Sequence, residues 1–300
     1  MGRYWPAGKI GLGERELERI VMSFNQKTNL VSLLICLAIV GGGVWYYKKT
    51  HPRYIPPPLK AEVTITIIPG WNLRQVAEYL VKQGIASSTD DVYKITGKPA
   101  YDYRRAAFLL PQIEDLKILA EKPAHVSYEG FLAPETYRVF KDAALLDVIK
   151  KLINQRDKEM DGAMWDDVKN SGHSYYEVLT MASLLEEEVQ SPEDKAKVAD
   201  ILWRRYKNNW ALQLDSSVHY AVNKTGNVFT TNKEREFNSL WNTYKYPGLP
   251  LGPIANPGLD SIKAALHPEK NSYWYFLTAK DGTVYYGKTL EEHNANKIRL

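Results

Sequence analysis

The chain has 300 residues, 44% hydrophobic and 25% charged, so it can bury a sizeable core and is neither a disordered nor a fibrous protein. Its formal net charge of +4 arises from 39 basic and 35 acidic residues, and no block of lysine and arginine marks a nucleic-acid binder. The single cysteine, Cys36, excludes an intrachain disulfide and a cysteine-based metal cluster.

Residues 30–47, LVSLLICLAIVGGGVWYY, carry no charge and approach the roughly 20 residues that a helix needs to cross a bilayer. Trp45, Tyr46 and Tyr47 suit a membrane interface. A cleavable signal peptide would have a shorter apolar region, and here a polar segment of 29 residues comes first. We therefore expect an uncleaved transmembrane helix over residues 30–47; the alternative is a buried core helix.

The basic residues barely decide the orientation of this helix. Five lie in residues 1–29 and four in residues 48–60, so the positive-inside rule hardly discriminates. Residues 48–60 also contain four prolines, which restrict the backbone, and we expect them to form an extended, stiff linker.

A small module of mixed secondary structure is predicted over residues 61–127, including its connector. Residues 62–68, EVTITII, alternate apolar and polar side chains as a half-buried strand does, and Pro69-Gly70 ends the strand. A helix is expected from about Leu73 to Lys82, ending at Gly84, and a second short helix begins near Asp90.

A larger domain that contains both helices and strands is predicted over residues 128–300. Helical spacing covers residues 143–160 and 175–189, and Ser191-Pro192 followed by two acids opens another helix. Two strands flanking Asp281-Gly282 predict a hairpin. The expected fold class is α+β, with a transmembrane helix, a small α/β module and a larger mixed α+β domain.

Three consecutive carboxylates end the segment MASLLEEEVQ over residues 181–190. With a helical period, Glu186 lies about 60° from the centre of the apolar stripe, Glu188 about 100°, and Glu187 nearly opposite. A carboxyl group at the edge of the core is partly desolvated, which raises its pKa as a general acid requires. The alternative is a boundary residue that pairs with a lysine or arginine.

Several segments together resemble the endolytic murein transglycosylase family, also called YceG-like. They are YEGFLAPETY (128–137), LTMASLLEEE (179–188), LQLDSSVHY (212–220), YPGLPLGPIANPG (246–258), SIKAALHP (261–268) and the closing His293-Asn294. The chain departs from the family pattern at Asp215-Ser216-Ser217, where Asp-Pro-Thr is usual, and at Phe131-Leu132-Ala133, where the family is more aromatic. The region before the catalytic domain is also short for the family.

The resemblance implies a single-pass enzyme of the cell membrane, with residues 1–29 in the cytoplasm and the remainder outside it. A LysM-like module over residues 61–127 would precede a catalytic domain over residues 128–300. The implied substrate is the glycan strand of peptidoglycan, with the cell wall synthesis machinery as a further partner. The family's catalytic glutamate falls on Glu186.

The implied reaction needs only one carboxyl group. Glutamic acid protonates the glycosidic oxygen that leaves N-acetylmuramic acid, and the resulting glutamate accepts the proton of that sugar's own C6 hydroxyl, which closes a 1,6-anhydro ring. Because this nucleophile is intramolecular, its effective concentration is high. No cofactor and no metal is expected, since His267 and His293 are too far apart for a local zinc motif.

Four polar residues in the matching segments are candidate substrate-binding residues. Gln213, Asn242 and Tyr244 suit sugar hydroxyl and N-acetyl groups, and Asp215 suits a developing positive charge at the anomeric carbon. A turn or capping role is the alternative for each. Two other functions stay open: a muramidase-type hydrolase with Asp215 or Glu188 as second carboxylate, and a non-catalytic wall-binding scaffold.

Overall fold

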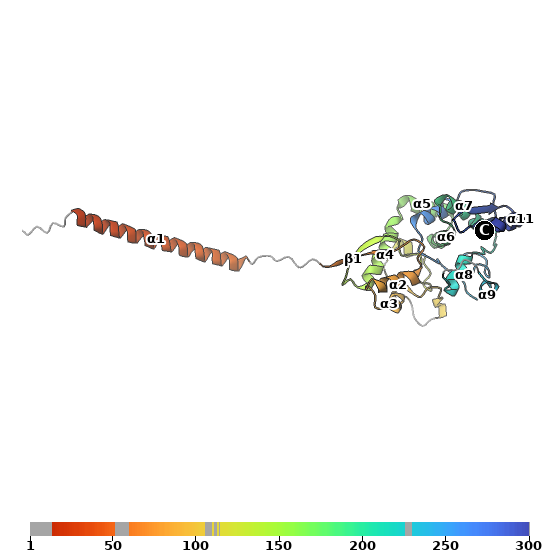
Figure 1. Ribbon diagram of the computed structural model, residues 1–300, viewed down its shortest axis with the longest axis horizontal. Helices are drawn as coiled ribbons and strands as arrows, with labels where there is room; N and C mark the ends of the chain where they lie inside the picture. The colour runs from red at the N-terminus through yellow and green to blue at the C-terminus, as the bar shows by residue number, and fades with distance from the viewer. Residues whose placement is uncertain are drawn as a thin grey trace, which may run out of the picture. The chain divides into compact units, whose positions relative to one another are not determined.

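The computed structural model describes residues 14–51, 60–105, 110, 113, 115–225 and 230–299. The chain divides into two compact units, Met1–Leu59 and Lys60–Leu300. The first unit, as far as it is described, is one helix, and the second contains both strands and helices (Figure 1). Residues 1–13, and residues 52–59 of the predicted linker, lie outside the described residues.

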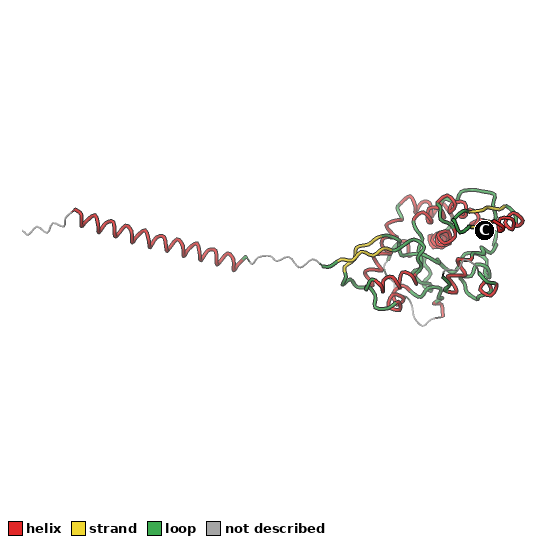
Figure 2. The backbone as a smooth tube through the Cα atoms, in the orientation of Figure 1, coloured by secondary structure: helices red, strands yellow, loops and turns green. Residues whose placement is uncertain are grey.

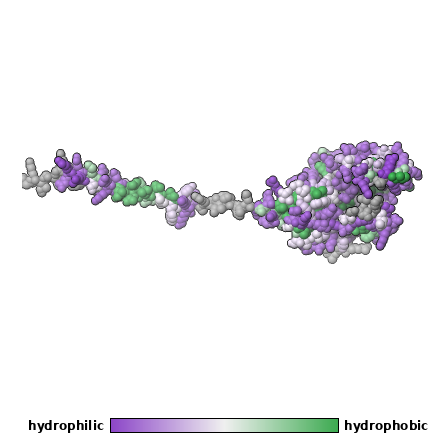
Figure 3. All heavy atoms as spheres, viewed as in Figure 1, coloured by the Kyte–Doolittle hydropathy of each residue, from purple (hydrophilic) through white to green (hydrophobic). Residues whose placement is uncertain are grey.

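Helix α1 (Glu14–Thr50) includes the predicted membrane span. Its segment Asn25–Thr50 is long and apolar enough to cross a bilayer, with a mean hydropathy of 2.0, and none of its most apolar stretch is buried. Figure 3 shows this exposed apolar band on α1. The exposure argues against a core helix, so α1 is an apolar helix able to serve as a membrane anchor. It also includes Lys48–Thr50, which the sequence had assigned to the linker.

The second unit begins with the strand and two helices that the sequence predicted. Strand β1 spans Glu62–Thr66, helix α2 Leu73–Lys82 and helix α3 Thr89–Thr96. The side chains of Asn72 and Ser88 accept hydrogen bonds from backbone N–H groups of the first helical turns. The strand is two residues shorter than predicted, and the helices are confirmed.

Strand β1 pairs in antiparallel register with strand β2 (Thr136–Phe140), so that Ile65 lies opposite Tyr137. One core cluster includes side chains from both sides of residue 128. The predicted division at this point is therefore not a break in the packing. The division itself, and the LysM-like character of residues 61–127, stay predictions.

The remaining elements are mostly helical, with one further hairpin (Figure 2). Strands β3 (Tyr275–Thr278) and β4 (Val284–Gly287) pair in antiparallel register around Gly282, as predicted. The other elements are η1 (Tyr103–Arg105), η2 (Lys117–Leu119), α4 (Leu145–Glu159), α5 (Gly162–Ser171), α6 (Tyr175–Glu188), α7 (Pro192–Lys207), α8 (Asp215–Val222), α9 (Asn232–Arg235), α10 (Leu259–Leu266), α11 (Leu290–Asn296) and η3 (Lys297–Arg299).

Helix α6 is central to the second unit. Ser174 and Glu177 form a capping box at its start, and residues 178–185 are all buried. Helix α10 packs against both α6 and α7. Ser191 caps α7 and Pro192 is its first residue, as predicted. This packing brings the C-terminal end of α6, where the three carboxylates lie, against α7 and the segment before α10. The α+β class is confirmed for the described chain.

Candidate active site

The three carboxylates at the end of α6 have different surroundings. Glu186 lies at the edge of the core, with 11% of its side chain exposed, and Glu187 is exposed. Glu188 is half-buried and accepts a hydrogen bond from Ser216 Oγ at 2.6 Å. The helical period therefore predicted correctly that Glu186 lies at the core margin and Glu187 on the outer face.

Three donors converge on one oxygen of Glu186. Its Oε2 atom accepts hydrogen bonds from Lys195 Nζ at 3.1 Å, Gly258 N at 3.1 Å and Ser261 Oγ at 2.5 Å. The donors belong to α7, the segment before α10, and α10 itself. Charged and neutral donors of this kind stabilise the carboxylate form. The structure shows no hydrogen bond to Oε1 from the residues that it describes, so this oxygen remains available to a substrate.

The contact with Lys195 was also the alternative expected from sequence, a boundary carboxylate paired with a base. The helical period indicated the desolvation of Glu186 but not the groups that donate hydrogen bonds to it. A signal for Lys195 was present: with Val198, Ala199 and Leu202 it follows the helical period, which puts a lysine on an apolar stripe. Ser261 and Gly258 lie inside the quoted family-like segments, but neither was predicted to contact Glu186.

Glu187 contacts a turn from the N-terminal part of the second unit. A Cβ atom built on Gly70 would lie 3.0 Å from Glu187 Oε1, and Gly70 has φ of +85°. This turn therefore suits glycine, which accepts that backbone conformation and leaves room for the carboxyl group. Partial desolvation, together with the neighbouring Glu188 and Glu186, raises the pKa of Glu187 to about 7. The sequence analysis did not anticipate this shift.

Glu188 connects α6 to two later elements. Besides the bond from Ser216, its backbone oxygen accepts a hydrogen bond from Thr278 Oγ1 at 2.9 Å. Burial raises the pKa of the Glu188 carboxyl group, and the Ser216 hydrogen bond acts in the opposite direction. These contacts hold the start of α8, which carries Asp215, next to the end of α6.

Asn256 fixes the segment before α10 to the turn at Gly70. Its backbone N–H donates to Trp71 O at 2.9 Å, and its backbone oxygen accepts from Gly70 N at 3.0 Å. The Asn256 side chain accepts from Leu132 N at 3.0 Å and donates to Trp71 O at 2.8 Å. Three segments far apart in sequence are thereby held together beside Glu186 and Glu187.

A buried carboxyl group, Glu129, completes this network with 2% of its surface exposed. It accepts hydrogen bonds from Leu73 N at 2.9 Å, Tyr220 Oη at 2.9 Å and Asn256 Nδ2 at 3.3 Å. Burial raises the pKa of Glu129 to about 8, although the Leu73 and Tyr220 hydrogen bonds lower it. Glu129 thus links α2 to the site, and the sequence analysis did not identify it.

Three of the four predicted substrate-binding residues lie in one region. Tyr244 Oη donates to Asp215 Oδ1 at 2.6 Å, and the guanidinium of Arg235 lies 3.8 Å from the same oxygen. Gln213 is exposed, its backbone N–H donates to Thr243 O at 3.1 Å, and its φ of +57° is uncommon for a residue other than glycine. Backbone strain of this kind is frequent at functional sites.

Asn242 is placed differently from the expectation. It is 1% exposed, and its Nδ2 atom donates to the backbone oxygens of Arg235 and Phe237, both at 2.9 Å. Its Oδ1 atom accepts from Tyr244 N at 3.0 Å. Because these backbone groups engage the side chain, the turn role given as the alternative describes Asn242, and we do not propose it further as a substrate ligand.

The two histidines weighed from the sequence lie in separate environments. His267 is paired with Asp167 at 3.0 Å, and His293 stacks on Tyr275. Within the described ranges, no group of three or more histidine, cysteine, aspartate or glutamate side chains is arranged to hold a metal ion.

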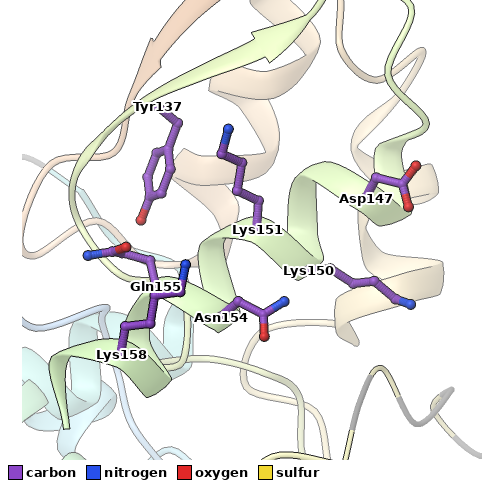
Figure 4. Close-up of a pocket in the computed structure, with 7 residues that line it drawn as sticks. All are labelled: Tyr137, Asp147, Lys150, Lys151, Asn154, Gln155 and Lys158. Atoms are coloured by element: carbon purple, nitrogen blue, oxygen red, sulfur yellow. The ribbon is translucent and has the colours of Figure 1, made fainter. Parts of the chain in front are cut away.

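An open pocket of about 350 Å³ lies along α4 and does not include the three carboxylates (Figure 4). Its lining residues are Tyr137, Asp147, Lys150, Lys151, Asn154, Gln155 and Lys158. Three lysines against a single aspartate give it a basic character, which would lower the pKa of a carboxyl group there and does not suit a general acid. The candidate active site is therefore the region around Glu186.

The chain belongs to the YceG-like family, whose model matches residues 48–299. It is 35% identical over 234 residues to the endolytic murein transglycosylase of Bacillus subtilis (strain 168), over 78% of this chain and 64% of that protein. It is 27% identical over 241 residues to the endolytic murein transglycosylase of Streptococcus pneumoniae (strain D39), over 78% and 44%. The chain thus spans less than two thirds of the length of these curated relatives.

A solved structure has a related fold. The crystal structure of a YceG-like protein from Listeria monocytogenes, at 2.6 Å resolution, aligns with a TM-score of 0.65 and 32% sequence identity. The alignment covers 78% of this chain and 75% of that chain. The family resemblance expected from the sequence segments is confirmed.

Proposed function

We propose that this protein is an endolytic lytic transglycosylase, a lyase that cleaves the bond between N-acetylmuramic acid and N-acetylglucosamine in peptidoglycan strands. The observation that carries the proposal is Glu186, held through Oε2 by three donors, with Oε1 free of partners among the described residues. The similarity to the endolytic murein transglycosylases of Bacillus subtilis and Streptococcus pneumoniae supports it.

In the proposed reaction Glu186 acts first as acid and then as base. A sugar seated over the site removes water from Oε1, which favours the protonated carboxyl group. The proton passes to the glycosidic oxygen, the bond from that oxygen to the anomeric carbon breaks, and positive charge develops on the muramic acid ring. The carboxylate then accepts the C6 hydroxyl proton as the C6 oxygen bonds to the anomeric carbon. The proton count balances without water.

The cluster around Asp215 suits the sugar that carries the developing charge. The Asp215 carboxylate can stabilise a cationic anomeric centre, and its contacts with Tyr244 and Arg235 hold it in place. Gln213 offers an exposed amide for sugar hydroxyl or N-acetyl groups. We assign substrate binding to Gln213, Asp215 and Tyr244.

The organisation of the chain is part of the proposal. We infer that residues 30–47 anchor the protein in the cell membrane, with residues 1–29 in the cytoplasm and residues 48–300 outside it. Residues 61–127 would form a LysM-like module before a catalytic domain over residues 128–300. Peptidoglycan strands are the proposed substrate, and the cell wall synthesis machinery is a proposed partner.

A muramidase-type hydrolase is the competing function, because three further carboxyl groups, those of Glu187, Glu188 and Asp215, belong to the candidate site. Such an enzyme would use a second carboxylate to activate water or attack the sugar. Glu188 is already hydrogen-bonded to Ser216, and Asp215 to Tyr244. Glu187, with its raised pKa, is the least engaged of the three.

Substitution of Glu186 by glutamine tests the proposal. The amide keeps the shape of the side chain but cannot transfer the proton, so strand cleavage should fall by a factor on the order of 10² to 10⁴ or more. Glu193→Gln, an exposed acid at the start of α7, is the matched control and should retain activity. Glu187→Gln should stay within about a few-fold of the original activity, because its side chain is exposed.

Mass spectrometry of the products separates the competing functions. Lytic transglycosylation leaves 1,6-anhydro ends, which are lighter by one water than the ends left by hydrolysis. Hydrolysed ends together with a deep loss in Glu187→Gln or Glu188→Gln would favour the muramidase. Unchanged cleavage with 1,6-anhydro ends by a folded Glu186→Gln chain would remove Glu186 from the mechanism. Absence of cleavage by the original chain would favour the third function, a non-catalytic wall-binding scaffold.

A further inference from the structure

The hydrogen bonds to Glu186 are asymmetric. All three donors bind Oε2, and they come from three separate places in the chain: Lys195, Gly258 and Ser261. We propose that these groups form a cradle that positions the Glu186 carboxyl group, so that Oε1 alone gives and receives the proton. The inference rests on the proposed function and assigns Lys195 and Ser261 as positioning residues for it.

The buried position of the Lys195 side chain is not explained by packing alone. It lies on the apolar stripe of α7, its side chain is 8% exposed, and its ion pair within the described chain is with Glu186. Removing an ammonium group from water is costly, and an apolar side chain of similar volume would fit such a stripe as well or better. A lysine retained here is more readily explained by its action on Glu186 than by stability.

A second buried cation supports the cradle from behind. Arg156 on α4 is fully buried, and its Nη2 atom donates to Pro257 O at 2.5 Å. The oxygen of Pro257 and the N–H of Gly258 belong to the same peptide group. Arg156 therefore holds and polarises the peptide whose N–H donates to Glu186. Glu159 pairs with Nη1 of Arg156 at 2.6 Å and keeps the guanidinium in place.

Ser261 supplies the uncharged part of the cradle. It is fully buried in the first turn of α10, and that helix packs against both α6 and α7. Its hydroxyl donates to Glu186 Oε2 at 2.5 Å. The packing of α10 on the two other helices thus fixes the hydroxyl relative to both Glu186 and Lys195.

The cradle restricts the reaction geometrically. With Oε2 committed to three donors, rotation of the carboxyl group would break all three hydrogen bonds, so the same oxygen faces the substrate in both proton transfers. A catalytic group displaced by about 1 Å can lose about 10²-fold in rate. The charged groups facing Glu186 in the described chain are Lys195 from α7, Glu187 and Glu188 from α6, and Arg156 acting through Pro257.

The first test compares Lys195→Met with Lys195→Arg in the full chain, in detergent micelles, on isolated glycan strands. Methionine fills the same space without a donor or charge, so kcat should fall about 10²-fold with KM within about two-fold. The alkaline limb of the pH–rate profile, where Glu186 loses the proton that it must give, should move to higher pH, because the carboxylate loses a cation. Arginine keeps the charge and should restore most of the activity, which a purely structural role would not require.

Ser261→Ala gives a milder second variant, because it removes one uncharged donor. It should lower kcat less than Lys195→Met and leave the melting temperature close to that of the original chain. Thermal unfolding of all variants verifies that the losses are not losses of folding.

A direct titration separates the cradle from the proposed reaction. Glutamate labelled with ¹³C at the carboxyl carbon is followed by NMR against pH, and the Glu186 signal is identified by its absence in Glu186→Gln. The titration of Glu186 should move to higher pH in Lys195→Met and return towards the original in Lys195→Arg. This readout needs no turnover, so it decides on the cradle even if the chain cleaves no glycan. A folded Lys195→Met chain with unchanged Glu186 titration would overturn the inference.

Discussion

Replacing Gly130 with alanine tests how tightly the segment before α10 is packed. Gly130 has φ of +86°, and a Cβ atom there would lie 2.7 Å from Pro253 Cβ, 2.8 Å from Pro253 Cγ and 3.3 Å from Leu179 Cδ2. The first two distances are shorter than carbon atoms tolerate. Either the proline ring or the Gly130 backbone must move, and Pro253 belongs to the segment that continues to Asn256 and Gly258.

Two contributions set the size of the effect. The left-handed backbone conformation costs a residue other than glycine about 1–2 kcal/mol. Overpacking against Pro253 and Leu179 costs about 1–3 kcal/mol more. Gly130→Ala should therefore lower the free energy of unfolding by about 2–5 kcal/mol. It should also lower kcat, because displacement of Pro253 shifts the Gly258 N–H that donates to Glu186.

Two other glycines separate these contributions. Gly172 follows α5 with φ of +73° and has no atom within 4 Å of a built Cβ, so Gly172→Ala should lose only about 1–2 kcal/mol. Gly162, in the first turn of α5, has neither a positive φ nor a close neighbour, so alanine there should stabilise by about 0.4–1 kcal/mol.

The assay is urea unfolding of residues 60–300, followed by tryptophan fluorescence, with the free energy taken from the linear dependence on denaturant. The order expected is Gly130→Ala least stable, then Gly172→Ala, then the original chain, then Gly162→Ala. A Gly130→Ala variant no less stable than Gly172→Ala would refute the close packing of Gly130 on Pro253.

Three further outcomes are expected. Burial raises the pKa of Glu129 from 4.5 to about 8, so the folded chain holds the Glu129 proton more tightly than the unfolded chain does. The contribution of this group to the free energy of unfolding is therefore complete below about pH 4.5 and declines by about 3–6 kcal/mol as pH rises towards 8. Glu129→Gln should remove that decline in denaturant unfolding measured at several pH values, and an unchanged slope would contradict the expectation. Glycan cleavage should continue in a chelator, since the intramolecular nucleophile needs no metal, and loss on chelation that added metal restores would count against this. A reporter fused after Lys60 should be active only if it functions outside the cytoplasm; activity of a reporter confined to the cytoplasm would reverse the proposed orientation.

Local patterns predicted the helices well because capping and burial act over a few residues. Ser191 with Pro192 marked the start of α7, and the apolar period of α6 placed Glu186 at the core margin. Both signals are contained within one helix and its first turn. The resemblance of the segments to the family then identified Glu186, among the three acids, as the expected catalytic residue.

The contacts between distant segments could not be predicted in this way. Nothing local to Gly70 indicates that it meets Glu187, and the donors to Glu186 come from positions 195, 258 and 261. The pKa of Glu187 depends on such packing as much as on its helix face. The partners of the Asn242 side chain could not be predicted for the same reason, because they are backbone oxygens at the end of α9 and just after it.

The pairing of β1 with β2 also affects the order in which the chain folds as it is synthesised. Thr66 and Thr136 hydrogen-bond across 70 positions of sequence. At ribosomal rates of about 5–20 residues per second, β1 waits roughly 4–14 s for its partner strand. During that interval the apolar side chains of Val63 and Ile65 lack the neighbours they have in the sheet. The N-terminal part of the second unit therefore cannot complete its fold ahead of the rest. A chaperone that binds exposed apolar side chains would act on this strand during that interval.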